Sequence, residues 1–293
     1  VESGGGRRGG STRRSASELG LPSTLLGYWP LDGDRYDYTD NNQDFTLSGS
    51  ASVSSRGGTP GTTASGGASI PDTASWLYRQ AFDPGAGVTA WTIEYWIWTS
   101  DTQGGHISYA TSNSSSEIVV RDVSSADNFM EVNFKTSSVN TDTPSSSLAS
   151  LHIGDGLQWH HVAIAHSADT LTYYVDGGAK WQATSAAWDA AVTQPDSLSC
   201  LVLGRVLSSA TDGCAGASSG TELVAAFSEL RLWGVERSSS QVSAGYATSL
   251  LSSCGTNESV YTNSSGAQLC GCAAGYTGQS GACAACAAGA YKG

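Results

Sequence analysis

Three histidines, His160, His161 and His166, lie close enough in the sequence to suggest a metal site. From Trp159 to His166 two sets of residues alternate with a period of two, which is typical of a β-strand. Neighbouring residues of a strand point to opposite faces, so His160 and His161 cannot bind one ion together. The pattern therefore favours packed or hydrogen-bonded strand histidines over a metal site.

The carboxylates are poorly placed for glycoside hydrolysis, which needs an acid and a base about 5 to 9 Å apart. The sequence contains no Glu-x-Asp-x-x-Glu pattern, and Glu94 and Glu131 each stand singly among apolar neighbours. Glu222 and Glu229 are seven positions apart and have no third acidic partner. We therefore predict no catalytic residues and a protein that is not an enzyme.

The densest run of oxygen ligands covers residues 32–44, with Asp32, Asp34, Asp37, Asp40, Asn41, Asn42 and Asp44. Carboxylate and amide oxygens are the hard ligands that calcium prefers. The run is not an EF-hand loop, because Tyr36, Asp37 and Gln43 occupy positions where that motif needs a ligand, a glycine and a glutamate. Two interpretations stay open, a calcium site and a solvated acidic loop.

The cysteines and the glycosylation sequons indicate an extracellular protein. Of seven cysteines, five lie in the last forty residues, a density typical of disulfides in a secreted chain. The closing Cys283-x-x-Cys286 is also the spacing of a redox or zinc motif, but it has neither a βαβ context nor a second such pair. Three sequons for N-linked glycans agree with secretion, at Asn113, Asn257 and Asn263.

Charge and composition exclude several classes of partner. The formal net charge is −12, although four of the fourteen basic residues lie within the first fourteen positions. An acidic body without a basic stripe argues against nucleic acid as a partner, and no apolar run approaches the roughly 20 residues of a membrane span. Residues 1–20 are rich in glycine, serine and arginine and are expected to form a flexible tail. Since the chain starts at Val1, we expect a processed protein or a segment of a longer one.

Short alternating segments predict an all-β fold. Residues 91–98, WTIEYWIW, carry bulky side chains on both faces, as do 159–166 and 171–175. Asp176 and Gly177 then supply a tight hairpin turn. Strands covered on both faces favour a sheet that packs against a second sheet.

The order of these segments along the chain resembles that of a known family. GYWPLD, WTIEYWIW, GLQWHHVAIAH, LTYYVDGG, LVLGR and FSELRLWGVERSSSQV follow one another over roughly residues 25–250. This order resembles the laminin-G-like, concanavalin-A-like jelly-roll family, with a short helix containing Ser240 to Leu250. The resemblance implies a two-sheet antiparallel jelly-roll sandwich over residues 21–250, followed at 251–293 by a small disulfide-rich module that is cut off at its end.

The same resemblance implies particular sites. The family often holds a rim calcium, which would fall at Asp40 and Asn42, although its usual late-strand carboxylate is Ser228 here, with an acid only at Glu229. It also often has a disulfide in a late strand, which implies a bond between Cys200 and Cys214. Residues 254–283 resemble the end of an epidermal-growth-factor-like module, which would pair Cys254 with Cys270 and Cys272 with Cys283. Cys286 would begin an ephrin-receptor-like repeat and find its partner beyond Gly293.

Three functions are weighed for this chain. The leading one is a non-enzymatic extracellular interaction or structural module of a larger surface, matrix or filament glycoprotein, with other extracellular proteins or glycans as partners. The alternative is a glycan-binding lectin domain, and the third is a divergent glycoside hydrolase. Sugar recognition would need exposed aromatic platforms. The tryptophans expected in loops or on outward faces are Trp76, Trp98, Trp181 and Trp188, whereas those expected to pack inside are Trp29, Trp96, Trp159 and Trp233.

Overall fold

The computed structural model describes most of the chain between residues 16 and 250 and four short strands after it. The described residues are 16–17, 19–54, 67–85, 87–101, 103–112, 118–123, 129–136, 139–142, 153, 158–184, 186, 195–207, 214, 222–246, 249–250, 258–262, 268–272, 276–277 and 284–285. The chain forms two compact units. One is Thr24–Leu250, and the other combines Val1–Ser23 with Leu251–Gly293.

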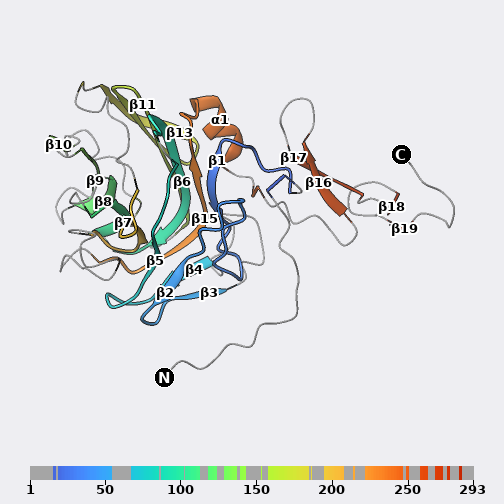
Figure 1. Ribbon diagram of the computed structural model, residues 1–293, viewed down its shortest axis with the longest axis horizontal. Helices are drawn as coiled ribbons and strands as arrows, with labels where there is room; N and C mark the ends of the chain where they lie inside the picture. Colours follow the sequence, from blue (N-terminus) through green and yellow to red (C-terminus); the bar gives the residue numbers. More distant parts are fainter. Residues whose placement is uncertain are drawn as a thin grey trace. The chain divides into compact units, whose positions relative to one another are not determined.

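The larger unit consists of two antiparallel sheets, which confirms the predicted all-β jelly-roll sandwich (Figure 1). Sheet 1 has the order β13-β12-β11-β6-β15-β4-β3, and β1 pairs with β15 as well. Its strands are β1 (Leu25–Trp29), β3 (Ser52–Ser54), β4 (Gly67–Ile70), β6 (Ala90–Thr99), β11 (His160–Ser167), β12 (Thr170–Val175), β13 (Gly178–Thr184) and β15 (Ala225–Trp233).

Sheet 2 has the order β10-β9-β8-β7-β14-β5-β2. Its strands are β2 (Thr46–Ser48), β5 (Trp76–Gln80), β7 (Gly104–Ala110), β8 (Ile118–Val123), β9 (Phe129–Thr136), β10 (Val139–Asp142) and β14 (Cys200–Leu203). Both sheets contain long crossovers, because strands distant in sequence such as β6 and β15, or β7 and β14, are direct neighbours.

The core between the sheets follows the alternation of the sequence. On β6, Trp91, Ile93, Tyr95 and Ile97 all point inward and are at most 4% exposed. Side chains such as Leu77 on β5 face them from sheet 2. Burial of large apolar side chains on both inner faces is the main force that holds such a sandwich together.

The histidines lie on both faces of β11, as the strand pattern predicted. His166 stacks on the ring of Trp91 with centroids 5.3 Å apart, whereas His161 faces outward beside Trp96. The Asp176 carboxylate lies 2.9 Å from His160 Nδ1 and also accepts a hydrogen bond from the backbone N–H of His161. Asp176 and Gly177 have φ of 50° and 75°, as a tight hairpin between β12 and β13 requires.

Strand β15 carries a β-bulge that the alternation pattern did not predict. Phe227 and Leu230 both face the core, so two residues between them, Ser228 and Glu229, replace the expected one. Glu229 has a φ of 54°, and its N–H donates to the carbonyl of Pro30. The bulge places the Glu229 carboxylate on the outer face of sheet 1, beside Arg231.

One helix, α1 (Ser239–Gly245), covers part of the outer face of sheet 1. It begins at an N-cap serine, Ser238, which forms a capping box with Gln241, and its Val242 packs on Ala163 and Ala165. The expectation of a helix running to Leu250 was wrong. The helix ends at Gly245, and the carbonyl of the next residue, Tyr246, accepts a hydrogen bond from the indole of Trp96.

The second unit contains two small two-stranded sheets. β16 (Glu258–Thr262) pairs with β17 (Gln268–Cys272), and β18 (Tyr276–Thr277) pairs with β19 (Ala284–Ala285). Cys254, Cys283 and Cys286 lie outside the described residues, and the side chains of Cys270 and Cys272 are not described. The growth-factor-like pairing therefore stays a prediction. Within the described part of the chain, no helix has the length and apolar character of a membrane span.

Candidate binding surface

The outer face of sheet 2 presents a pair of aromatic side chains on β5. Because Leu77 points into the core, Trp76 and Tyr78 point to the opposite face, and both are partly exposed. Their neighbours on β14 and β7 are fully buried, although they too point outward. These neighbours are Cys200, Val202, Ser108 and Ala110. Something must therefore cover the middle of this face.

Two described residues after β14, Leu207 and Cys214, pack on these outward side chains and form a cover over them. Cys200 and Cys214 form the disulfide that the family resemblance implied, with Cα atoms 5.4 Å apart. Leu207 lies over the sheet, and its backbone N–H donates to the Ser108 hydroxyl at 3.1 Å. Trp76 and Tyr78 pack against this buried group and remain partly exposed at its margin.

Arg205 lies directly over the ring of Trp76. Its guanidinium carbon is 4.1 Å from the ring centroid, a cation–π contact, and the residue is only 3% exposed. The backbone here is held to the rim of the sheet, since Gly204 donates to the His106 carbonyl and accepts from Leu223. A Cβ at Gly105 would lie 2.4 Å from the backbone carbon of Arg205, so this approach requires a glycine.

The Trp76–Arg205 pair carries buried donors that the described residues do not satisfy. Trp76 Nε1 and Arg205 Nε are both buried, and neither has a hydrogen-bond partner in that part of the structure. Burial lowers the pKa of Arg205, and the nearby Glu222 carboxylate opposes that change. Arginine nevertheless remains charged in proteins, so the pair combines an aromatic ring with a cation that has unused donors.

A second group of polar residues lies on the outer face of sheet 1, where it is fully enclosed. Glu94, Glu229 and Arg231 are each at most 1% exposed. Arg231 lies 3.0 Å from the Glu229 carboxylate and 3.5 Å from that of Glu94, and Arg237 forms an ion pair with Glu94. Burial raises the pKa of Glu94, but contact with His161 and the charges of both arginines outweigh it and hold that pKa below its usual value.

Neighbouring side chains complete this buried charge network. The hydroxyls of Tyr28 and Ser249 donate to the two oxygens of Glu229, at 2.8 and 2.7 Å. Arg231 also donates to the Gly245 carbonyl, and Arg237 to the Gln241 carbonyl. The network therefore joins β1, β6 and β15 to the segment around α1, and its carboxylates are not presented to a substrate.

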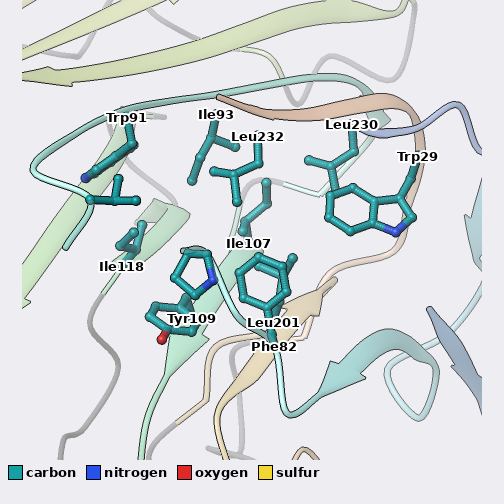
Figure 2. Close-up of a pocket in the computed structure, with 12 residues that line it drawn as sticks. Trp29, Phe82, Trp91, Ile93, Ile107, Tyr109, Ile118, Leu201, Leu230 and Leu232 are labelled. Atoms are coloured by element: carbon teal, nitrogen blue, oxygen red, sulfur yellow. The ribbon is translucent and has the colours of Figure 1, made fainter. Parts of the chain in front are cut away.

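An apolar cavity lies between the sheets (Figure 2). In Figure 2, Trp91, Ile93, Leu232, Leu230 and Trp29 from sheet 1 face Ile107, Ile118, Tyr109, Leu201 and Phe82. Its volume is about 30 Å³, and its other lining residues are Pro84 and Val88 from the loop after β5. No lining side chain is a carboxylate, a histidine or a cysteine, so the cavity offers no general acid, base or metal ligand.

The acidic run at residues 32–44 is organised around Asp37, which is 1% exposed. Its carboxylate accepts hydrogen bonds from the backbone N–H groups of Tyr28, Thr39 and Gln43. Burial is the largest influence on this group and raises the pKa of Asp37 despite these donors. The most enclosed carboxylate of the run thus serves the backbone of its own loop.

The predicted calcium ligands lie at the surface of this loop. Asp40 is exposed, and the side-chain amide of Asn42 donates to the Asp40 carbonyl at 2.8 Å. Among the described residues, no group of three or more histidine, cysteine, aspartate or glutamate side chains is arranged to hold a metal ion. Calcium at Asp40 and Asn42 stays a prediction, which calcium titration of the wild type and Asp40→Ala in a calorimeter would test.

Most of the predictions for the tryptophans are confirmed, and one is wrong. Trp29, Trp96, Trp159 and Trp233 are buried, as expected, and Trp76 and Trp98 are partly exposed on outward faces. The expectation for Trp181 was wrong, because it pairs with the core residue Tyr173 and packs against the same core. The sites that lie outside the described residues are Trp188, Asn113, Asn257 and Asn263.

Sequence reasoning missed Arg205 as a site residue. The motif LVLGR marks the fold, and nothing near it in the sequence connects Arg205 to Trp76. The two residues meet because β14 and β5 are paired, with Leu203 opposite Leu77. The available signal was a Gly-Arg sequence at the end of a buried strand.

A family model described as "Concanavalin A-like lectin/glucanases superfamily" matches residues 62–243. No curated protein sequence matches the chain. Several solved structures share its fold. Domain 4 of an extracellular arabinanase of the GH43 class from Geobacillus stearothermophilus, solved with arabinotriose, aligns with a TM-score of 0.54 and 16% identity, over 77% of this chain and 98% of that domain.

Two further matches are binding domains of botulinum neurotoxin DC. The one solved with rat synaptotagmin II aligns with a TM-score of 0.52 and 13% identity, over 84% of this chain and 55% of the toxin chain. The one solved with SialylT aligns with a TM-score of 0.50 and 11% identity, over 76% of this chain and 50% of the toxin chain. The chain thus spans about half the length of these toxin domains. At such identities the likeness concerns the fold alone.

Proposed function

The chain belongs to the concanavalin A-like lectin and glucanase superfamily, and we propose that it is a non-enzymatic extracellular module that binds glycans. The observation that carries the proposal is the pair of partly exposed aromatic rings, Trp76 and Tyr78, on the outer face of sheet 2. Aromatic rings beside a few fixed polar groups are the usual means by which proteins bind the apolar faces of sugars.

The rigidity of this surface supports a binding role. Trp76 and Tyr78 lie on a strand rather than on a loop, and their inner sides pack against the group that the Cys200–Cys214 disulfide anchors. A side chain that is already held in place loses less conformational entropy when a ligand binds. Arg205, stacked on Trp76, adds a directional polar group.

A non-enzymatic role is supported by the burial and ion pairing of the carboxylates on the described strands of sheet 1. Glu94 and Glu229 are buried and engaged by arginines under the segment around α1. Hydrolysis of a glycosidic bond needs two carboxyl groups that flank the substrate. A divergent glycoside hydrolase is the competing hypothesis, and assays for reducing sugar released from glycans bound by the protein separate the two.

Solved structures of the same fold support a sugar ligand but do not identify which sugar. The arabinanase domain was solved with arabinotriose, and one toxin domain with SialylT. The other toxin domain was solved with a protein, synaptotagmin II. We therefore keep as a second candidate an interaction with another extracellular protein of the same assembly, since the chain carries cysteines and sequons typical of a secreted glycoprotein.

A glycan array with the purified chain, with and without calcium, tests the proposal. We expect selective binding that Trp76→Ala and Tyr78→Ala each weaken, because each removes one of the two rings. Trp98→Ala is the matched control, since Trp98 is a partly exposed tryptophan on the outer face of the other sheet. Absence of glycan binding by the wild type, together with capture of a purified extracellular protein, would favour the second candidate.

A further inference from the structure

We propose that the Trp76–Arg205 pair is a subsite for an oxyanion, so that the glycan bound on this face is an acidic one. The proposal rests on the proposed glycan-binding function and narrows its ligand to sugars that carry a carboxylate or a sulfate. It starts from two neighbouring donors, Trp76 Nε1 and Arg205 Nε, that are buried and have no hydrogen-bond partner among the described residues. Native proteins leave few such groups, and each one calls for an explanation.

The charge of Arg205 makes the case stronger than the missing hydrogen bonds alone. The residue is 3% exposed, and the Nε of its guanidinium is buried without a hydrogen-bond partner among the described residues. The charge of the nearby Glu222 carboxylate acts on it and opposes the effect of burial. A buried charge without a hydrogen-bonded partner is costly, and stacking on an aromatic ring compensates only part of that cost. A ligand that brings an anionic oxygen would supply the missing partner.

The geometry favours an oxyanion over a neutral hydroxyl. A guanidinium presents several N–H donors in one plane and accepts none, which matches the two oxygens of a carboxylate or the three of a sulfate. The guanidinium carbon lies 4.1 Å from the centroid of the Trp76 ring, so the indole N–H is close to the same group. An acidic sugar can place its anionic group on these donors while its ring contacts the aromatic side chains.

The site also differs from a basic surface that attracts polyanions. The whole chain has a net charge of −12, so long-range electrostatics oppose an anionic ligand. Salt screens that long-range repulsion, whereas it screens a largely buried contact much less. Binding through Arg205 should therefore persist or strengthen as salt is raised from low to physiological concentration. Binding through a cluster of surface lysines would weaken steeply.

The test compares matched acidic and neutral oligosaccharides by calorimetry, using the whole chain. The probes are an oligogalacturonate, its methyl ester, and a neutral and a sulfated galactan of equal length. We expect an acidic probe to bind on the order of tenfold to a hundredfold more tightly than its neutral counterpart, as for a hydrogen bond to a charged group. The arm that binds, carboxylate or sulfate, identifies the source of the oxyanion.

Two variants assign the effect to the pair. Arg205→Gln should bring the affinity for the acidic probe down to that of the neutral one, and Trp76→Phe should keep the ring contact and lose only the indole donor. Arg35→Gln, at an exposed arginine, is the control and should change neither affinity. Arg205→Gln should unfold at the same urea concentration as the wild type or a higher one, because it removes a buried charge that lacks a partner.

The outcomes separate this proposal from the one on which it rests. If acidic and neutral probes bind equally well and Arg205→Gln changes nothing, the oxyanion subsite is wrong while glycan binding stands. If no oligosaccharide binds to the wild type, glycan binding fails first. Inorganic sulfate that binds as tightly as the acidic sugars would overturn the assignment to a sugar ligand. Loss of both acidic and neutral binding in a destabilised Arg205→Gln would mean that Arg205 is structural.

Discussion

Arg231 and Glu94 are direct partners across β15 and β6, and their side chains meet 3.5 Å apart on the outer face of sheet 1, where neither is exposed by more than 1%. A second arginine, Arg237, shares the same carboxylate from the segment that leads into α1. Glu94 is thus the common partner of two cations, Arg231 on β15 and Arg237 in the segment before α1.

Replacing Glu94 should therefore be much more costly than removing an ordinary carboxylate. We expect Glu94→Gln to lower the free energy of unfolding by about 3–5 kcal/mol, since it leaves buried cations without their counter-charge. Urea denaturation measures the change, and Glu236→Gln, at an exposed glutamate beside α1, should stay within about 0.5 kcal/mol of the wild type. Equal effects of the two substitutions would contradict a role for the buried network.

His161 should make the stability of the fold depend on pH. Burial lowers the pKa of His161 below the usual value of about 6.5, although Glu94 opposes the change. Between these two pKa values the unfolded chain binds a proton that the folded chain does not, so the free energy of unfolding falls as the pH falls. The loss should reach at most about 1.4 kcal/mol per pH unit.

Denaturation at pH 7.5, 6.5 and 5.5 measures this slope in the wild type and in His161→Phe, which keeps a ring beside Trp96 and Tyr246. The variant should have a shallower slope. The lowered pKa values of Asp176 and Glu94 act only at more acidic pH and do not disturb this window. Parallel slopes for the two proteins would show that His161 does not titrate on unfolding.

The Cys200–Cys214 disulfide should stabilise the larger unit and the position of its cover on sheet 2. It closes a loop with a sequence separation of 14, for which the chain-entropy model gives about 3 kcal/mol. The double variant Cys200→Ser with Cys214→Ser should lose about that amount in urea denaturation. Reductant should destabilise the wild type and leave this variant unchanged with respect to the larger unit. Peptide mapping that finds both thiols reduced in the native protein would refute the bond.

The apolar cavity should make one leucine unusually sensitive. Leu230 lines the cavity and is 2% exposed, so Leu230→Ala enlarges an existing void and should cost about 3–5 kcal/mol. Benzene should then raise the Tm of this variant, because apolar cavities stay dry and accept small apolar molecules. Leu203→Ala, in the same core but away from the cavity, is the control, and an equal response to benzene in both variants would contradict the prediction.

The sequence predicted the direction of a side chain correctly where the residues next to it in the chain determine that direction. The period of two on β6 and β11 correctly placed Trp91 in the core and His160 and His161 on opposite faces. Asp176 and Gly177 correctly predicted the hairpin, because positive φ is a local property of the backbone. Trp29 and Trp233 are buried, as expected, although Trp233 lies on the face opposite the core residue Leu232.

The failures occurred where partners distant in sequence decide the outcome. The N–H of Glu229 in the bulge donates to the carbonyl of Pro30, and the carbonyl of Tyr246 just after α1 accepts from the indole of Trp96. Trp181 faces the core because its pairing with β12 contains a register shift after Tyr173. Arg205 meets Trp76 only through strand pairing, so neither side chain could be identified as half of a site from its own segment.

The position of β1 has a consequence for how the protein is made. Its residue Leu25 pairs with Trp233, and Tyr28 bonds to Glu229 across 201 positions of the sequence. During synthesis the first strand therefore has no edge to join until almost the whole domain has left the ribosome. Contacts of such long sequence separation make folding slow, and strands that have not yet paired expose edges that can pair with other chains. We expect a slow folder that depends on protection from aggregation as it emerges.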